Sequence, residues 1–179
     1  MEEDMGAQAQ ATERESVVLG EVEGESLWFN NDLLTIKATG DQTGGEFVLL
    51  EELARRGKTT PLHAHPAETE SFYVLDGAAL LHVDGVEHRL GTCGFASVPA
   101  GVPHAYLVIS ETARLIILIT PGDEAMLDFF RHAGEPAVER RLPEERPLDM
   151  ERIGAAAARS GAVTILGPPP FDEAVLRPA

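Results

Sequence analysis

Two histidines, His63 and His65, stand one residue apart in the stretch GKTTPLHAHPAETESFYVLDG, and Glu70 follows five positions after the second. Imidazole nitrogens and carboxylate oxygens are common ligands of divalent transition metals. On a β-strand, this i, i+2 spacing places both rings on one face, near enough to bind one ion. Glu70 begins the next expected strand. If it faces inward, its buried charge requires a partner, and a divalent cation is the obvious one.

A fourth candidate ligand lies further along the chain, in PAGVPHAYLV. Pro99 and Gly101 predict a tight turn, after which His104 begins a strand. Three neutral imidazoles and one carboxylate suit iron, manganese, cobalt, nickel or zinc. We therefore expect one divalent transition-metal ion per chain, bound by His63, His65, Glu70 and His104. The alternative is that these residues form a solvated hairpin without a metal.

The elements that must position these side chains are short strands. Between residues 17 and 121, short apolar runs alternate with turn signals such as DQTGGE and VDGVE. Strands this short and this regularly spaced predict an all-β fold, an antiparallel sandwich or barrel. Residues 1–16 precede them as an acidic, polar leader that we expect to be disordered.

Residues 122–179 have a different pattern and predict a helical extension with an irregular tail. DEAMLDFFRHAG has the spacing of an amphipathic helix, with acids in its first turn. LDMERIGAAAARSG predicts a second helix, for which Asp149 is a plausible cap and Gly161 a stop.

Strand alternation also predicts which side chains share the interior with the candidate ligands. Counting from Glu70, Phe72 and Val74 point the same way, and counting from His104, Tyr106 and Val108 do. These four residues are our candidate substrate-binding set, because such a lining suits a flat aromatic or weakly polar ligand.

Composition narrows the function classes. The chain of 179 residues has 14 basic and 30 acidic side chains and a formal charge of −16, which disfavours nucleic acid and anionic membranes as partners. The longest strongly apolar run, LIILI, is too short to span a bilayer. One cysteine permits no internal disulfide, and the acidic N-terminus does not resemble a secretory signal. We expect a cytoplasmic protein.

Together, the two motifs resemble those of the cupin superfamily. G-x5-H-x-H-x4-E-x6-G is matched by the segment from Gly57 to Gly77, and P-x-G-x2-H by that from Pro99 to His104. The resemblance implies a double-stranded β-helix, that is, a jelly-roll barrel, and metal binding by the matching positions. Two positions depart from the pattern: Cys93 replaces a glycine, and Val108 replaces an asparagine. Neither is a metal ligand in the family.

The overall organisation, one barrel followed by a helical tail with AAAARSGAVTILGPPP, resembles that of bacterial single-domain cupins similar to quercetin 2,3-dioxygenase. This resemblance implies a metal-dependent oxidoreductase that uses dioxygen on a flavonol or another enol or phenol metabolite, with Glu70 as both ligand and general base. Two alternatives remain open: a metal-dependent isomerase, cyclase or lyase of a small carbonyl or phenolic metabolite, and a non-catalytic small-molecule-binding cupin. The family also implies a homodimer, which could pair through the N-terminal strands.

Overall fold

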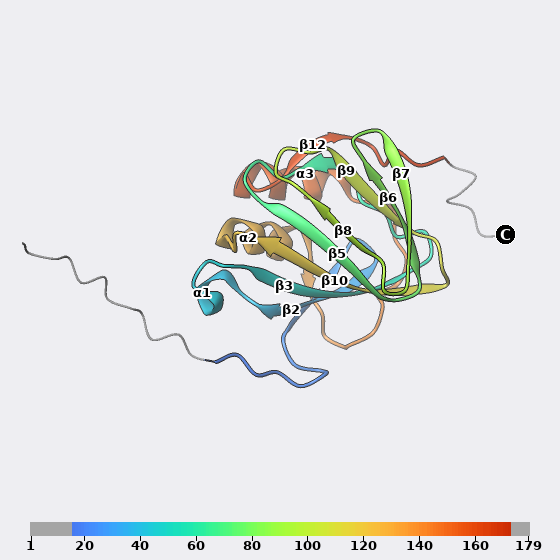
Figure 1. Ribbon diagram of the computed structural model, residues 1–179. Helices are drawn as coiled ribbons and strands as arrows, with labels where there is room; N and C mark the ends of the chain where they lie inside the picture. The colour runs from blue at the N-terminus through green and yellow to red at the C-terminus, as the bar shows by residue number, and fades with distance from the viewer. Residues whose placement is uncertain (1–15, 173–179) are drawn as a thin grey trace, which may run out of the picture.

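The computed structural model describes residues 16–172, and it consists mainly of strands arranged in two antiparallel sheets (Figure 1). The expected all-β jelly-roll architecture with a helical extension is confirmed. The predicted disordered leader lies outside the described residues, except for Ser16. The first sheet has seven strands in the order β11-β1-β2-β3-β10-β5-β8, and the second has five in the order β12-β4-β9-β6-β7.

The elements have the following bounds. The strands of the first sheet are β1 Glu25–Phe29, β2 Asp32–Ala38, β3 Val48–Arg55, β5 Thr69–Asp76, β8 Phe95–Val98, β10 Thr112–Thr120 and β11 Glu135–Pro136. Those of the second sheet are β4 Leu62–Ala64, β6 Ala78–Val83, β7 Val86–Gly91, β9 His104–Val108 and β12 Thr164–Gly167. The helices are α1 Gly40–Thr43, α2 Glu124–Ala133 and α3 Met150–Ser160.

Alternation of buried and half-buried residues explains the first sheet. Along β3, the residues Val48, Leu50, Glu52 and Ala54 are buried while those between them are half-buried. The neighbouring β10 follows the same two-residue period, and β3 and β10 pair continuously. Their inward side chains meet those of the second sheet in one apolar core, as expected for two sheets packed face to face.

Two motif glycines adopt conformations that other residues rarely adopt. Gly77 has a φ of +83°, and a Cβ atom there would lie 2.3 Å from the carbonyl oxygen of Thr112. Gly101 has a φ of +77°, and its N–H donates to the carbonyl oxygen of His65 (2.7 Å). The glycine of the second motif therefore joins the two halves of the candidate site.

The two expected C-terminal helices are present. Asp123 caps α2 through the N–H of Ala125, and Asp149 caps α3 through the N–H of Arg152. Figure 1 shows both helices together at one end of the barrel. The buried face of α2 carries Met126, Leu127, Phe129 and Phe130. Among the described residues, no helix is long and apolar enough to cross a membrane.

Candidate metal centre

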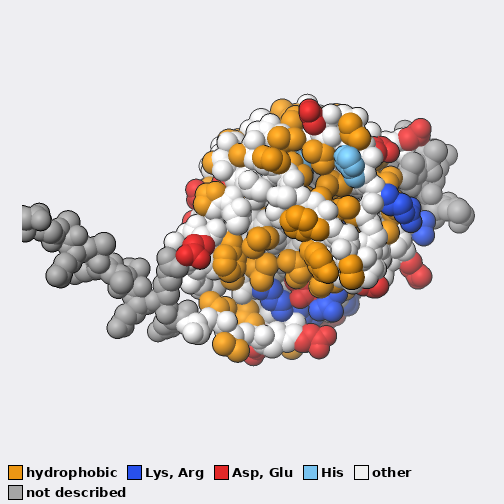
Figure 2. Space-filling view, in the orientation of Figure 1, with side chains coloured by type: hydrophobic (Ala, Val, Ile, Leu, Met, Phe, Trp, Pro, Cys, Tyr) orange, Lys and Arg blue, Asp and Glu red, His pale blue; other side chains and the backbone are white. Residues whose placement is uncertain are grey.

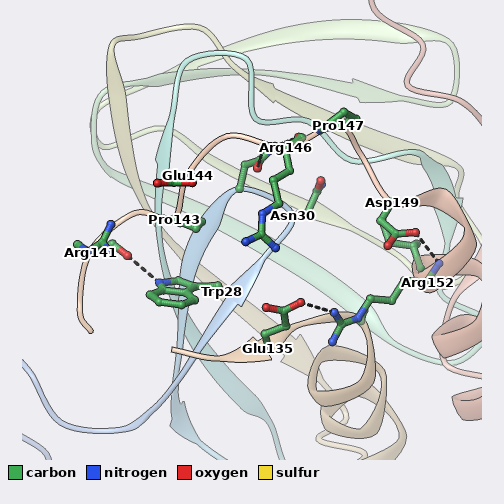
Figure 3. Close-up of a pocket in the computed structure, with 13 residues that line it drawn as sticks. Trp28, Asn30, Glu135, Arg141, Pro143, Glu144, Arg146, Pro147, Asp149 and Arg152 are labelled. Atoms are coloured by element: carbon green, nitrogen blue, oxygen red, sulfur yellow. Dashed lines mark hydrogen bonds and ion pairs between the residues drawn. The ribbon is translucent and has the colours of Figure 1, made fainter. Parts of the chain in front are cut away.

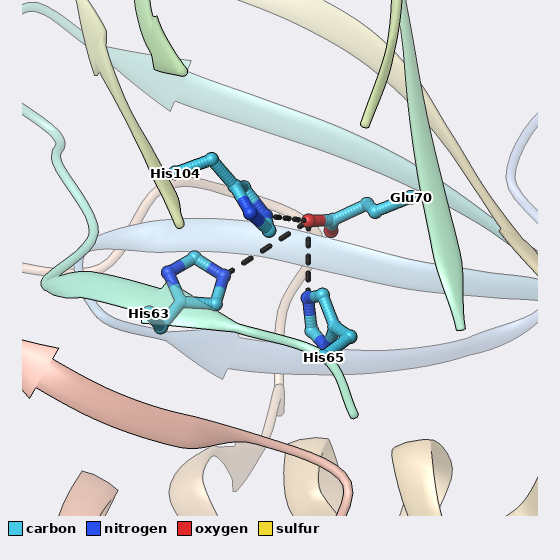
Figure 4. Close-up of side chains that lie close together, drawn as sticks. All are labelled: His63, His65, Glu70 and His104. Atoms are coloured by element: carbon cyan, nitrogen blue, oxygen red, sulfur yellow. Dashed lines mark hydrogen bonds and ion pairs between the residues drawn. The ribbon is translucent and has the colours of Figure 1, made fainter. Parts of the chain in front are cut away.

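Four side chains from three strands and one loop meet inside the barrel, as the sequence motifs predict (Figure 4). His63 lies on β4, His65 follows the end of that strand, Glu70 lies on β5, and His104 begins β9. Pairing of β4 with β9 places His63 directly opposite His104. Short, separately positioned strands thus bring together residues that are up to 41 positions apart in the chain.

The candidate ligand atoms converge on one carboxylate oxygen. Glu70 Oε2 lies 2.8 Å from His104 Nε2, 3.2 Å from His65 Nε2 and 4.0 Å from His63 Nε2. All four ligand atoms lie within 4.8 Å of one another. Ligands bound at about 2.1 Å from a single ion are separated by about 3 to 4 Å, so this spacing is compatible with one shared ion.

The other nitrogen of each imidazole is held by the backbone. Nδ1 of His63 donates to the carbonyl oxygen of Pro61 (2.9 Å), and Nδ1 of His104 donates to that of Val102 (2.9 Å). Nδ1 of His65 donates to the carbonyl oxygen of Ala162, 3.1 Å away in the C-terminal segment. These bonds select the tautomer whose free Nε2 points at the cluster, the arrangement that metal-ligating histidines require.

Burial and mutual contact shift the pKa values of these groups. Burial, with repulsion from His104, lowers the pKa of His63 to about 3, so this imidazole is neutral at neutral pH. Burial also opposes charging of His65, but Glu70 outweighs it and raises the pKa of His65. Burial raises the pKa of Glu70, yet His65 and His104 together hold it well below its usual range. The site thus favours a carboxylate among imidazoles.

The chemistry of these donors fits a divalent transition metal. All four residues are buried, with 1% to 8% of their surface exposed, and three imidazole nitrogens already point at the carboxylate. A negative charge with this little solvent requires a cation or protonated neighbours. His63, His65, Glu70 and His104 can therefore hold one metal ion.

A cavity of about 40 Å³ adjoins the cluster. Its wall includes His63, His65 and Glu70, and the apolar part is formed by residues of the barrel and of the C-terminal extension. These are Phe29, Leu34, Ile117, Met126, Phe129, Phe130, Ile153, Val163 and Ile165. The helices α2 and α3 therefore close the cavity on the side away from the barrel.

The structure divides the candidate substrate-binding residues into two groups. Tyr106 lines the cavity, whereas Phe72, Val74 and Val108 are buried in the core and do not line it. Phe72 packs between His104 and Tyr106, with ring centroids 6.3 and 5.6 Å away. Phe72 therefore packs against the candidate ligand His104 without lining the cavity.

Sequence reasoning missed three ionisable residues beside Tyr106 on the same cavity wall. Asp32 and Glu52 line the cavity, and Lys58 forms ion pairs with both carboxylates. One signal was available: Glu52 occupies an inward position of the alternating strand β3. A charge at such a position indicates a buried partner.

A second, larger cavity of about 240 Å³ lies on the outside of the barrel (Figure 3). It is bounded by Trp28, Asn30 and the connection between α2 and α3, and none of the candidate ligands lines it. Trp28 Nε1 donates to the carbonyl oxygen of Arg141 (2.9 Å), and Arg152 pairs with Glu135 (2.7 Å). The first contact attaches the connection to β1, and the second joins α3 to β11.

A barrel of two antiparallel sheets with a buried group of three histidines and one glutamate defines a class of small metal-site β-barrel proteins. The comparisons with known proteins agree. A family model described as the cupin domain matches residues 49–120. The chain belongs to the cupin superfamily.

Two relatives illustrate the similarity. The chain is 33% identical over 138 residues to quercetin 2,3-dioxygenase of Bacillus subtilis, an alignment that covers 76% of this chain and 40% of that protein. The chain thus spans less than half the length of this relative. The crystal structure of an RmlC-like cupin from Shewanella frigidimarina superposes with a TM-score of 0.54 and 21% identity, covering 63% of this chain and 96% of that one. This second likeness concerns the fold.

Proposed function

We propose that the protein is a metal-dependent dioxygenase of the quercetinase-like type, acting on a flavonol or another enol or phenol metabolite. The observation that carries the proposal is the buried group of three imidazoles and one carboxylate with converging ligand atoms. The 33% identity to quercetin 2,3-dioxygenase supports a dioxygenase reaction over other metal-dependent reactions. A bound transition-metal ion would supply Lewis-acid and redox chemistry to the substrate and to dioxygen.

Glu70 is the residue that we propose as general base. It lines the cavity, and its Oε2 faces the three imidazoles. Contact with His65 and His104 keeps its pKa low, which makes the carboxylate a weak base in its resting position. Glu70 must therefore turn away from one imidazole to accept a proton from a substrate hydroxyl. The neighbouring cavity is where that hydroxyl would lie.

The size of the cavity sets a condition on the substrate. A volume of about 40 Å³ holds roughly two or three water molecules, far less than a flavonol. Since Phe129 and Phe130 of α2 and Ile153 of α3 form one side of it, we propose that these helices move outward to admit the substrate. The same helices then exclude bulk water during the reaction.

Metal content and oxygen consumption test the proposal. Elemental analysis of the purified protein should find about one transition-metal ion per chain, and His63→Ala and His104→Ala should lose it. His88→Ala, which changes an exposed histidine outside the site, should keep it. The metal-loaded protein, mixed anaerobically with quercetin and then with oxygen, should consume oxygen in an electrode chamber.

Two outcomes would select other functions, and a third would exclude the flavonol reaction. Turnover of a carbonyl or phenolic substrate without oxygen, supported by redox-inert zinc, would identify an isomerase, cyclase or lyase. Ligand-induced thermal stabilisation without product would identify a binding protein. Absence of oxygen uptake with quercetin for every metal from manganese to zinc would remove the flavonol reaction.

We further propose that the protein forms a homodimer, as many cupins do. The exposed side chains of Tyr73, Leu75 and Phe95 lie on the neighbouring strands β5 and β8, and Figure 2 shows hydrophobic side chains gathered on this face. This face supports the proposal better than the N-terminal strands do, since β1 already pairs with β11 at Leu27 and Trp28. Analytical ultracentrifugation of the wild type and Phe95→Glu tests it, because a dimer through this face would dissociate in the variant.

A further inference from the structure

Four side chains form a buried polar network in the barrel, beside the cavity. Asp32 begins β2, Glu52 lies on β3, Lys58 precedes β4 and Tyr106 lies on β9. Asp32 and Glu52 are completely buried, and Lys58 and Tyr106 are 3% and 4% exposed. Three of the four, all except Lys58, line the cavity that adjoins the metal centre. This network has no place in the metal chemistry described above.

The hydrogen bonds of the network use every proton of the ammonium group. Lys58 Nζ donates to Asp32 Oδ2, to Glu52 Oε1 (2.8 Å) and to the hydroxyl oxygen of Tyr106 (2.9 Å). The Tyr106 hydroxyl in turn lies 2.7 Å from both oxygens of Glu52. An ammonium has three protons, so Lys58 has none left to give.

The second oxygen of Asp32 is thereby left without a partner. Asp32 Oδ1 is buried and has no hydrogen-bond partner among residues 16–172, although the residue lines the cavity. Glu52, by contrast, has both oxygens hydrogen-bonded. Leaving a buried acceptor unpaired is unfavourable, and a purely structural ion pair has no need of one. When one of the two carboxyls is protonated, Asp32 and Glu52 also lie within hydrogen-bonding reach of each other, but no donor among the described residues reaches Asp32 Oδ1. The free oxygen therefore indicates a site for a hydrogen-bonding group within the cavity.

We propose that Asp32 Oδ1 binds a hydroxyl group of a small uncharged ligand in the cavity, at a position separate from the metal centre. The remaining wall, formed by residues such as Phe29, Leu34 and Ile117, is apolar and selects an aromatic or weakly polar body for that ligand. Binding at this position requires no metal. It does rest on one part of the proposed function, because the ligand occupies the cavity assigned to the substrate and an aromatic ring enters about 40 Å³ only when α2 and α3 move outward.

A hydroxyl group fits this position better than an amine or a carbonyl does. Burial and the neighbouring Glu52 raise the pKa of Asp32 well above its usual range, against the attraction of Lys58, so this carboxyl binds a proton readily. A hydroxyl can donate to the ionised carboxylate and accept from the protonated acid. A ligand carbonyl serves only the protonated form, and an ammonium would lie close to Lys58 and be repelled by it.

Two isosteric probes and two charge-matched variants test the proposal. Phenol and toluene differ by a hydroxyl in place of a methyl group. Their affinities for the metal-free protein are measured by NMR titration, in which the shifted amide signals also locate the site. Asp32→Leu removes the free oxygen, whereas Glu52→Gln removes an equal charge and leaves that oxygen in place. Each variant leaves one carboxylate to pair with Lys58, and circular dichroism confirms that each is folded.

The measured quantity is the ratio of phenol affinity to toluene affinity. In Asp32→Leu the ratio should fall at least about fivefold relative to the wild type, the effect of losing one buried hydrogen bond. In Glu52→Gln it should stay within about twofold of the wild type. An unchanged ratio in Asp32→Leu, an equal fall in both variants, or no binding of phenol to the wild type would overturn the proposal. None of these results depends on metal binding or on oxygen uptake.

Discussion

Nδ1 of His65 lies 3.1 Å from the carbonyl oxygen of Ala162, so a candidate metal ligand of the barrel is oriented by the C-terminal extension. Ala162 follows α3 directly, after Gly161 ends that helix with a φ of +71°. The next strand, β12, pairs with β4, on which His63 lies. The extension is therefore part of the support of the candidate metal centre.

Gly161→Ala tests this support. A side chain at a positive φ strains the turn that carries the Ala162 carbonyl, so we expect a loss of about 1 kcal/mol in stability and roughly tenfold weaker metal binding. Gly154→Ala is the matched control, since it lies within α3 with open space around it and should stabilise the helix. Zinc titration and urea unfolding measure both effects. Equal zinc affinities for the two variants would contradict the role of Ala162.

Zinc affinity should fall as the pH is lowered through neutrality. In the metal-free protein, Glu70 raises the pKa of His65, whereas His63, with a pKa of about 3, is neutral there and has no second proton to lose. Zinc must displace the proton on His65, which predicts about a tenfold change in affinity per pH unit below that pKa. In Glu70→Gln, burial dominates and lowers the pKa of His65, so binding becomes weaker but depends less on pH. Isothermal titration in buffers of different ionisation enthalpy would count the protons released.

Stability of the metal-free protein should respond to Asp32 in a defined direction. The pKa of Asp32 is raised above its ordinary value of 3.8 in the folded protein, so the folded state holds this proton more tightly than the unfolded chain does. The stabilisation that this proton gives to the folded state is complete below pH 3.8 and is lost as the pH rises toward the folded pKa. The stability of Asp32→Asn relative to the wild type should therefore improve as the pH rises from 4 to 8. The gain is about 1.4 kcal/mol for each pH unit that separates the folded pKa from the ordinary one.

Urea unfolding across this pH range gives the comparison for Asp32→Asn. A difference for Asp32→Asn that stays constant with pH would show that this carboxyl titrates alike in both states.

Enlarging the cavity should favour larger ligands. Phe129→Ala removes a ring from the cavity wall, while Leu127→Ala removes a fully buried side chain that does not line the cavity. Both should lose about 2 to 5 kcal/mol of stability. Only Phe129→Ala should bind quercetin more tightly, because α2 then needs a smaller outward movement to admit this ligand. Fluorescence titration of the zinc-loaded proteins would measure it, and tighter binding by both variants would point to general loosening.

The sequence alone was sufficient for the barrel and for the grouping of the four candidate ligands. The fixed spacing of the first motif identified His63, His65 and Glu70, and the turn at Gly101 places His104 opposite His63. Alternation correctly placed Phe72, Val74 and Val108 in the interior. It could not tell which part of the interior is packed core and which is cavity, because that depends on where the C-terminal helices lie.

The polar network was not predictable for a related reason. Asp32, Glu52 and Lys58 come from different segments, and only the pairing of β2 with β3, together with the path of the loop before β4, brings them together. Local periodicity carries no information about such long-range contacts. The contact between His65 and Ala162 was hidden likewise, since 97 positions separate them.

The position of Ala162 near the end of the described chain has a consequence for biosynthesis. A ribosome releases strands β1 to β10 well before it releases α3 and the residues that follow. Until then His65 has no carbonyl to fix its ring, and one wall of the cavity is missing. Tight binding of a cation by the four candidate ligands would therefore follow the emergence of α3 and Ala162 from the ribosome.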